Sequence, residues 1–176
     1  MTEPRYDMAA LTRWAQDVFT AAGLGRAQAE AVGRYLVDAD AMGHDTHGLG
    51  LATWYLDLIE NGTVTKDGTP KVVSDRGAAV CWDGLRLPGA WLTDEAMTLA
   101  VERAAEHGTC TVAVGNAHHI GAHAVYLQKA TDAGMMVMLA SSAPSAATVA
   151  PFGGITPVYS PDPVAYGIPT DGDPIL

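Results

Sequence analysis

The chain has 176 residues, 48% of them hydrophobic, and a formal net charge of −10 at pH 7. This length and composition are enough for a packed core of about one domain, which excludes a disordered chain. Nucleic acids and anionic membrane surfaces reward clustered Lys and Arg, so 20 acidic residues against 10 basic ones argue against both as partners.

Helices are predicted for the amino-terminal third of the chain. Apolar side chains recur at helical spacing over residues 7–22 and again over residues 26–41, and Gly23 and Gly43 follow these stripes as stop signals. A third helix is expected over residues 49–60, before the turn signal Asn-Gly. The apolar stripes are most simply explained as core positions.

Short strands alternate with helices in the rest of the chain. The predicted elements are strands over residues 71–74 and 78–82, a helix over 91–107, a strand over 109–114, a helix over 121–133 and a strand over 135–140. The first two strands suit a hairpin, and the later alternation indicates βα units with helices packed on a sheet. We therefore expect an α/β fold, with a helical segment over residues 1–65 and an α/β domain over residues 66–176.

Nothing in the sequence indicates export or membrane insertion. Residues 1–6 contain no apolar leader, and no run reaches the about 18 apolar residues of a membrane span. Cys81 and Cys110 each lie in an apolar run typical of a strand, which favours free thiols in a reducing compartment over a disulfide. We expect a cytoplasmic protein.

The segment over residues 43–50 (GHDTHGLG) places two imidazoles, a carboxylate and a hydroxyl between two predicted helices. On spacing alone a turn is the simpler interpretation, because Asp45 or Thr46 can cap the next helix. The alternative is a site that handles protons, since histidine has an unperturbed pKa near 6.5. Tyr55 would face the same way if its helix face lines a cleft, and is otherwise an ordinary half-buried tyrosine.

A second polar group, residues 115–121 (GNAHHIG), follows a predicted strand and precedes a predicted helix. Open α/β sheets tend to bind ligands at such strand ends, although a cap or loop is the simpler interpretation of spacing alone. Zinc would need more ligands than the pairs His44 with His47 and His119 with His123 provide. We therefore predict no metal site.

Residues 37–48 (VDADAMGHDTHG) and 59–62 (IENG), with Tyr55 between them, resemble the malate/L-lactate dehydrogenase family. These are NAD(P)-dependent 2-hydroxyacid dehydrogenases that do not use the ordinary Rossmann fold. The family signature reads Gly and then Ser-His-Gly after an acidic helix end, and Thr46 stands at the serine position. Family members carry Asn-Ser-x-His-Phe-Gly or Asn-Ser-His-His-Ile-Gly where this chain has residues 116–121. The resemblance implies α/β units around a mixed sheet, as in sulfolactate and malate dehydrogenases.

A third set of residues follows the last predicted strand. Residues 149–154 (VAPFGG) match the family's Ala-Pro-Phe-Gly-Gly, whereas residues 141–143 (SSA) and 160–162 (SPD) replace Thr-Asn-Ser and Gly-Thr-Asn. An ionised Asp accepts hydrogen bonds but cannot donate them, so Asp162 would meet a carboxamide or phosphate differently from Asn. The cofactor-binding residues implied by the resemblance are His119, Ser141, Ser142, Ala143 and Asp162.

One departure concerns the substrate. Many relatives carry an Arg three residues after the signature glycine, placed to grip a substrate carboxylate with two hydrogen bonds, and this chain has Leu51 there. Family branches with the Gly-His-Asp-Ser-His-Gly form also lack this Arg, and the chain looks closest to those hydroxycarboxylate dehydrogenase-like members. We expect such a branch to accept bulkier or differently held acids.

The resemblance implies reversible hydride transfer between NAD or NADP and a small 2-hydroxy or 2-oxo acid, in a homodimer. An imidazole that moves the hydroxyl proton is worth about a hundredfold to ten-thousandfold in rate. We predict His47 as this acid or base, steadied by Thr46, and His119 beside the carbonyl or the nicotinamide; the exchanged roles stay open. Thr46 and Tyr55 are the implied substrate-binding residues.

The resemblance covers the whole chain but only the amino-terminal part of a family member. Relatives continue into a strand reading Leu-Asp-x-Ala-Thr-Ser, which contacts the cofactor, and this chain stops at residues 173–176, where that strand should start. The chain thus resembles a family member truncated at its carboxyl end, and two hypotheses follow. The chain is a dehydrogenase that acts once completed, or it is a non-catalytic fragment or small-acid binding module of the same fold.

Overall fold

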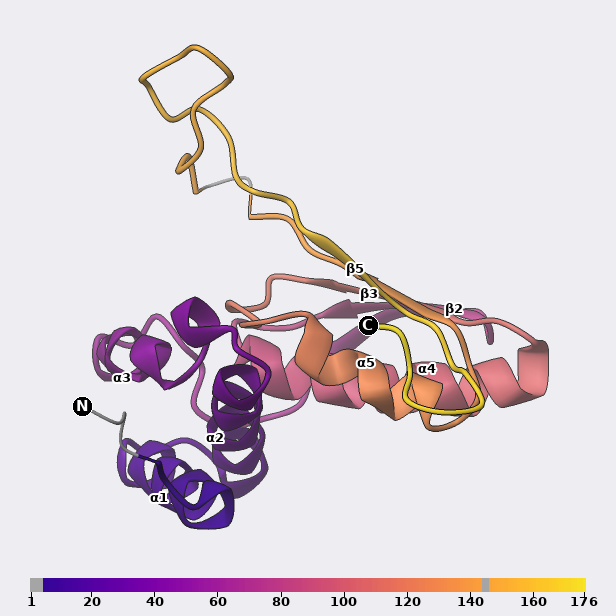
Figure 1. Cartoon of the computed structure of the whole chain (residues 1–176), viewed down its shortest axis with the longest axis horizontal. Coiled ribbons are helices and arrows are strands. Elements are labelled where there is room, and N and C mark those ends of the chain that lie inside the picture. The colour runs from indigo at the N-terminus through magenta and orange to yellow at the C-terminus, as the bar shows by residue number, and fades with distance from the viewer. Residues whose placement is uncertain (1–4, 144–145) are drawn as a thin grey trace.

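The structure is a computed structural model, and it describes residues 5–143 and 146–176 (Figure 1). Its amino-terminal helices are α1 (Met8–Ala21), α2 (Arg26–Ala41) and α3 (Ala52–Glu60), with the short 3-10 turns η1 (Asp45–His47) and η2 (Leu49–Leu51) between the last two. The Asp7 carboxylate caps α1 by accepting a hydrogen bond from the Ala10 N–H at 2.7 Å. Gly33 allows α1 and α2 to approach closely, because a Cβ there would lie 2.7 Å from the Gln16 nitrogen.

Two small sheets follow the helices. The elements are β1 (Lys71–Asp75), β2 (Ala79–Asp83), α4 (Gly89–His107), β3 (Thr111–Gly115), α5 (Ala124–Thr131), β4 (Val137–Ala140) and β5 (Val164–Gly167). β1 and β2 form the expected antiparallel hairpin, and β3 pairs parallel to β2 after the crossover through α4. β4 and β5 form a separate antiparallel pair. The α/β fold with a mixed sheet, expected from the sequence and its family resemblance, is confirmed.

One hydrophobic core joins the helices to the α/β part. α4 and α5 lie along one face of the strands (Figure 1), and α2 contacts both of them. Phe19 of α1, Leu92 of α4 and Tyr126 of α5 are each at most 1% exposed and belong to the same cluster. The division into residues 1–65 and 66–176 stays a prediction.

Element boundaries differ from the predictions where glycine controls the backbone. The helix expected from residue 121 begins only at Ala124, because Gly121 has φ +69°, a left-handed conformation that cannot start a helix. The segment expected as one helix from residue 49 first forms the 3-10 turn η2. Strand β5 is absent from the sequence predictions, since four residues after Pro163 carry little periodicity.

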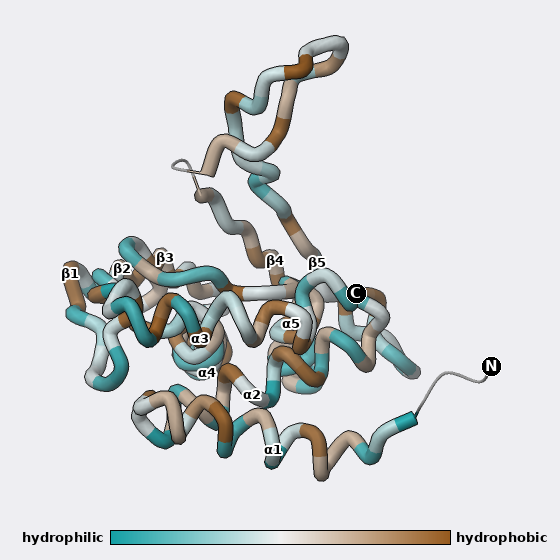
Figure 2. The backbone as a smooth tube through the Cα atoms, turned by 90° about the vertical axis from the view of Figure 1, so that its left-hand side faces the viewer, coloured by the Kyte–Doolittle hydropathy of each residue, from teal (hydrophilic) through white to brown (hydrophobic). Residues whose placement is uncertain are grey.

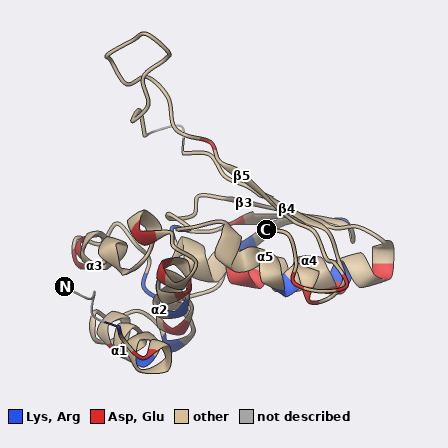
Figure 3. Ribbon diagram, in the orientation of Figure 1, with Lys and Arg blue, Asp and Glu red and all other residues tan. Residues whose placement is uncertain are grey.

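The chain between β4 and β5 leaves the body of the molecule as a long arm, residues 141–143 and 146–163 (Figures 1 and 2). Phe152 and Ile155 near its tip are fully exposed, and the bridge between Val149 and Tyr159 joins its two sides. Asp162 is the one charged residue of the arm (Figure 3).

In the described parts of the chain, no helix combines the length and apolar character that crossing a membrane requires.

Candidate active site

His47 stands at the end of the turn η1, on an exposed corner between α2 and α3. Its backbone N–H donates to the His44 carbonyl at 2.7 Å, which shapes the turn. The Thr46 hydroxyl lies 2.9 Å from His47 Nδ1. Thr46 therefore holds one ring nitrogen of His47 and leaves the other free.

Asp40 of α2 holds the turn between α2 and α3 in place. Its Oδ2 accepts a hydrogen bond from the Leu49 N–H at 2.9 Å. A Cβ on Gly48 would lie 1.8 Å from Asp40 Oδ1, so only glycine fits between this carboxylate and the turn. The sequence identified Asp40 only as part of an acidic helix end, and the contact depends on the fold.

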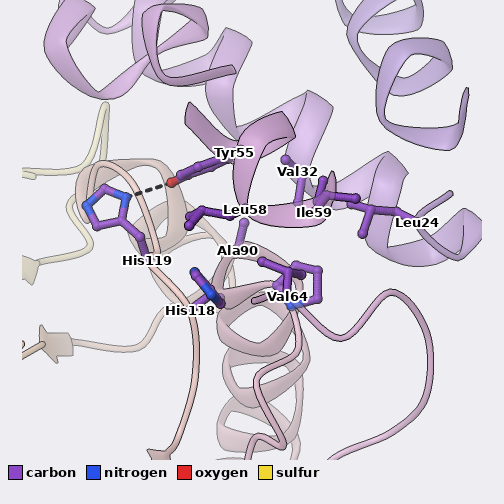
Figure 4. Close-up of a pocket in the computed structure, with 11 residues that line it drawn as sticks. Leu24, Val32, Tyr55, Leu58, Ile59, Val64, Ala90, His118 and His119 are labelled. Carbon is purple, nitrogen blue, oxygen red and sulfur yellow. Dashed lines mark hydrogen bonds between the residues drawn. The ribbon is translucent and has the colours of Figure 1, made fainter. Parts of the chain in front are cut away.

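Tyr55 connects α3 to the second histidine segment. Its side chain is 8% exposed, and its hydroxyl lies 2.6 Å from His119 Nδ1, as Figure 4 shows. The sequence left open whether Tyr55 faces a cleft or is an ordinary half-buried tyrosine; in the structure it is buried and contacts His119. The two residues are far apart in the chain, so this pair is formed by packing.

His119 lies in the loop between β3 and α5, next to the corner. Its ring centre is 5.8 Å from that of His47 and 5.3 Å from that of Trp54. Gly89, at the start of α4, packs against this loop, because a Cβ there would lie 2.0 Å from the His118 carbonyl oxygen. Thr46, His47, Tyr55 and His119 therefore form one site.

Partial desolvation keeps His119 uncharged near neutral pH, although the residue is exposed. Desolvation, helped by the nearby imidazoles of His47 and His123, lowers the pKa of His119 to about 4. Desolvation also raises the pKa of Tyr55 and lowers that of His118. Near neutral pH the site thus contains a neutral imidazole at residue 119 and a protonated phenol at residue 55.

Hydrogen bonding assigns the proton of the neutral His119 ring. The Gly121 backbone N–H donates to His119 Nδ1 at 3.3 Å, and a backbone amide can only donate. Nδ1 is therefore the acceptor, the Tyr55 hydroxyl donates to it as well, and the ring proton lies on Nε2. His119 offers an N–H donor to whatever binds in front of Nε2.

An apolar cavity lies behind Tyr55 and His119 (Figure 4). It is lined by Leu24, Val32, Leu58, Ile59 and Val64, among others. Its volume of about 20 Å³ holds about one water molecule. In this structure the cavity is too small for a carboxylic acid substrate.

The predicted cofactor-binding residues of the third set form a separate group at the base of the arm. The Ser141 N–H donates to the Pro163 carbonyl at 3.2 Å, and the Ala143 N–H donates to Ser160 Oγ at 3.4 Å. The Ser160 hydroxyl donates to the Asp162 carboxylate. This hydrogen bond, together with one from Ser142, lowers the pKa of Asp162, so its carboxylate is ionised.

The chemistry of this group favours some ligands over others. Residues 141–143 and 160–162 offer hydroxyls and a carboxylate, and they contain no Lys or Arg. A carboxylate accepts hydrogen bonds from sugar hydroxyls or a carboxamide but repels phosphate. The group therefore suits a sugar or an amide better than a phosphate.

The sequence offered His123, which precedes α5, only as a zinc ligand together with His119. Its Nε2 is buried and has no hydrogen-bond partner. Desolvation lowers the pKa of His123, while a hydrogen bond with the Gly121 backbone acts in the opposite direction. Within residues 5–143 and 146–176, no three His, Cys, Asp or Glu side chains are grouped to hold a metal ion.

A family model described as malate/L-lactate dehydrogenase matches residues 6–176. The chain belongs to this family. Hydroxycarboxylate dehydrogenase B of Escherichia coli is 33% identical over 173 residues, which cover 98% of this chain and 48% of that protein. The (2R)-3-sulfolactate dehydrogenase (NADP(+)) of Chromohalobacter salexigens is 33% identical over 160 residues, covering 89% of this chain and 46% of that protein.

Solved structures of the family share the fold. Malate dehydrogenase from Pyrococcus horikoshii matches with a TM-score of 0.89 at 28% identity, over 97% of this chain and 49% of that one. Sulfolactate dehydrogenase from Methanocaldococcus jannaschii matches with a TM-score of 0.86 at 25% identity, over 96% and 48%. The chain thus spans about half the length of the family members that it matches, as the resemblance to an amino-terminal part predicted.

Proposed function

We propose that this chain supplies the histidine-bearing half of a dehydrogenase that interconverts 2-hydroxy acids and 2-oxo acids with NAD or NADP. The observation that carries the proposal is the pair of neighbouring imidazoles, one of them with its pKa lowered to about 4, in a chain of the malate/L-lactate dehydrogenase family. Two imidazoles in different surroundings can take different roles in one proton transfer.

The proposed roles follow from the tautomer of His119. Since its Nε2 already carries a proton, His119 donates a hydrogen bond to the oxygen on C2 and polarises the carbonyl. His47 then takes the hydroxyl proton during oxidation and returns it during reduction, with Thr46 holding its ring. The nicotinamide, when bound, supplies or accepts the hydride. Tyr55 orients His119 from the buried side.

The cofactor and assembly are parts of the same proposal. Residues 1–65 supply the substrate side and residues 66–176 the cofactor side, where Ser141, Ser142, Ala143 and Asp162 hold the nicotinamide end. We propose a homodimer, supported by the exposed apolar arm. Two free cysteines support a cytoplasmic location, because reducing compartments keep thiols unpaired.

The alternative is a small-acid binding module without turnover. Such a module would bind 2-oxo acids through the same histidines and would leave NADH unoxidised.

The test follows nicotinamide absorbance while 2-oxo acids are added to the purified chain with NADH or NADPH. We expect His47→Gln to lower turnover by about a hundredfold or more. His119→Gln keeps an N–H donor and should lose much less activity than His119→Ala. His107→Gln, at the distant end of α4, is the matched control.

Each result separates the two functions. Turnover that is lost in His47→Gln and partly kept in His119→Gln supports the dehydrogenase and its role assignment. Equal losses in both glutamine variants contradict the roles. Acid binding by calorimetry without any NADH oxidation leaves the binding module as the function.

A further inference from the structure

Trp54 is an exposed aromatic side chain beside the reacting groups. Its ring centre lies 5.3 Å from that of His119, in an edge-on arrangement at 62°, and 5.4 Å from that of Tyr55. The residue is nevertheless 44% exposed. An indole that lies beside an imidazole and also faces solvent is available to cover a ligand bound at that imidazole.

The charge around the site is the second observation. Residues 43–61 and 115–128, which carry the four site side chains, contain no Lys or Arg. Leu51, one helical turn before Trp54 and Tyr55, is apolar and partly buried. A substrate with a second carboxylate would therefore meet no basic partner from these segments, and Asp57 and Glu60 add negative charge nearby in the chain.

The geometry also limits where a substrate side chain can lie. The cavity lined by Tyr55 and His119 has room for about one water molecule, which favours another place for the group attached to C2. The Trp54 ring, whose centre lies 5.3 Å from that of His119, offers an exposed apolar surface for that group.

We propose that Trp54 determines substrate choice: the site prefers 2-oxo and 2-hydroxy acids with an apolar side chain, best an aromatic one, over acids with a second carboxylate. The inference rests on the proposed dehydrogenase function. An aromatic group packed against the indole removes apolar surface of both rings from water and gains a ring contact. A carboxylate in the same place is desolvated without a partner.

The test compares phenylpyruvate, pyruvate and oxaloacetate as substrates of the purified chain with NADH or NADPH. For the unaltered protein, kcat/KM should be at least about tenfold higher for phenylpyruvate than for oxaloacetate. Trp54→Leu should lower kcat/KM for phenylpyruvate by about tenfold, mainly by raising KM, and should change that for pyruvate much less. Trp54→Phe keeps a ring and should retain most of the preference.

Two further variants complete the design. Trp14 on α1 is also exposed, and Trp14→Leu is the matched control. It should leave kcat/KM for phenylpyruvate and for pyruvate unchanged. Leu51→Arg places a cation one turn before Trp54 and should raise kcat/KM for oxaloacetate relative to phenylpyruvate.

The outcomes distinguish the inference from the function on which it rests. Turnover with no preference for phenylpyruvate, or a preference that survives in Trp54→Leu, overturns the inference and leaves the dehydrogenase intact. Absence of turnover and of calorimetric binding with all three acids overturns both. If the chain binds the acids without turnover, the three acids and the variants are compared by their dissociation constants, and the same ratios are expected.

Discussion

At the scale of single residues, the contacts of His119 set its protonation state. His119 lies beside Trp54 and Tyr55, and partial desolvation lowers its pKa to about 4. In the proposed reaction this neutral ring donates a fixed hydrogen bond while His47 exchanges the proton.

This difference predicts a pH effect. In an NMR titration of the imidazole protons, the His119 signal should have its midpoint near pH 4, far below an unfolded histidine near 6.5. His47→Gln removes a neighbouring positive charge and should move that midpoint upward. A midpoint near 6.5 in the folded protein would contradict the lowered pKa of His119.

The lowered pKa of His119 should also make the free energy of unfolding depend on pH. The folded state binds the His119 proton more weakly than the unfolded chain, so the free energy of unfolding should decrease as pH falls from about 6.5 to about 4. Urea unfolding at several pH values measures this decrease. It should be smaller in His119→Gln, which has no titrating ring.

At the scale of elements, one carboxylate joins two helices and the corner between them. Asp40 belongs to α2, and its hydrogen bond to the Leu49 N–H lies at the beginning of the helical segment η2 and α3. A negative charge at that end also interacts favourably with the helix dipole. The positions of His47 and Tyr55 therefore depend on the same contact.

A double-mutant cycle tests this contact. Asp40→Ala leaves the Leu49 N–H without its acceptor and should cost about 1–3 kcal/mol of unfolding free energy. Gly48→Ala forces its Cβ against the carboxylate and should cost about 1–3 kcal/mol. The double variant should lose clearly less than the sum, because removing the carboxylate also removes the clash.

Gly50→Ala is the control for this cycle, since its Cβ would meet only the Asp45 carbonyl at 3.5 Å. It should be close to neutral in the same urea titration. Strict additivity of Asp40→Ala and Gly48→Ala would show that the two residues do not compete for the same space.

At the scale of the whole molecule, apolar surface is concentrated on the arm and on one face of the second sheet. Phe152 and Ile155 are fully exposed, and the cross-strand neighbours Met138 and Tyr166 are 62% and 50% exposed. Surface of this kind marks contact with another polypeptide. The arm has almost no charge to oppose such contact (Figure 3).

We predict that the chain associates with itself through this surface. Sedimentation velocity over a range of concentrations should show a species larger than the monomer. The double change Phe152→Ser with Ile155→Ser should weaken association by about tenfold or more, because each side chain contributes about 1.5–3 kcal/mol when fully buried. Trp14→Ser, a similar change on α1, should have no effect. A monomer at every concentration would contradict the proposed homodimer.

Local pattern alone predicted most of the fold. The stripes of α1 and α2, the β1–β2 hairpin and the alternation from α4 to β4 follow from periodicity and turn residues, which act over a few neighbouring positions. Strand β5 was missed because it is short and follows the arm. The start of α5 was misplaced because the backbone conformation of Gly121 is set by its surroundings.

For the site, the sequence alone determined which residues take part: the histidines of two segments and a tyrosine at helical spacing. The family resemblance indicated their chemistry. Tertiary structure decided how they act. The contact of Tyr55 with His119, the neighbours that keep His119 neutral and the contact of Asp40 with Gly48 all join residues from different elements. Hydrophobic periodicity specifies which face of an element is buried, and only packing specifies what that face meets.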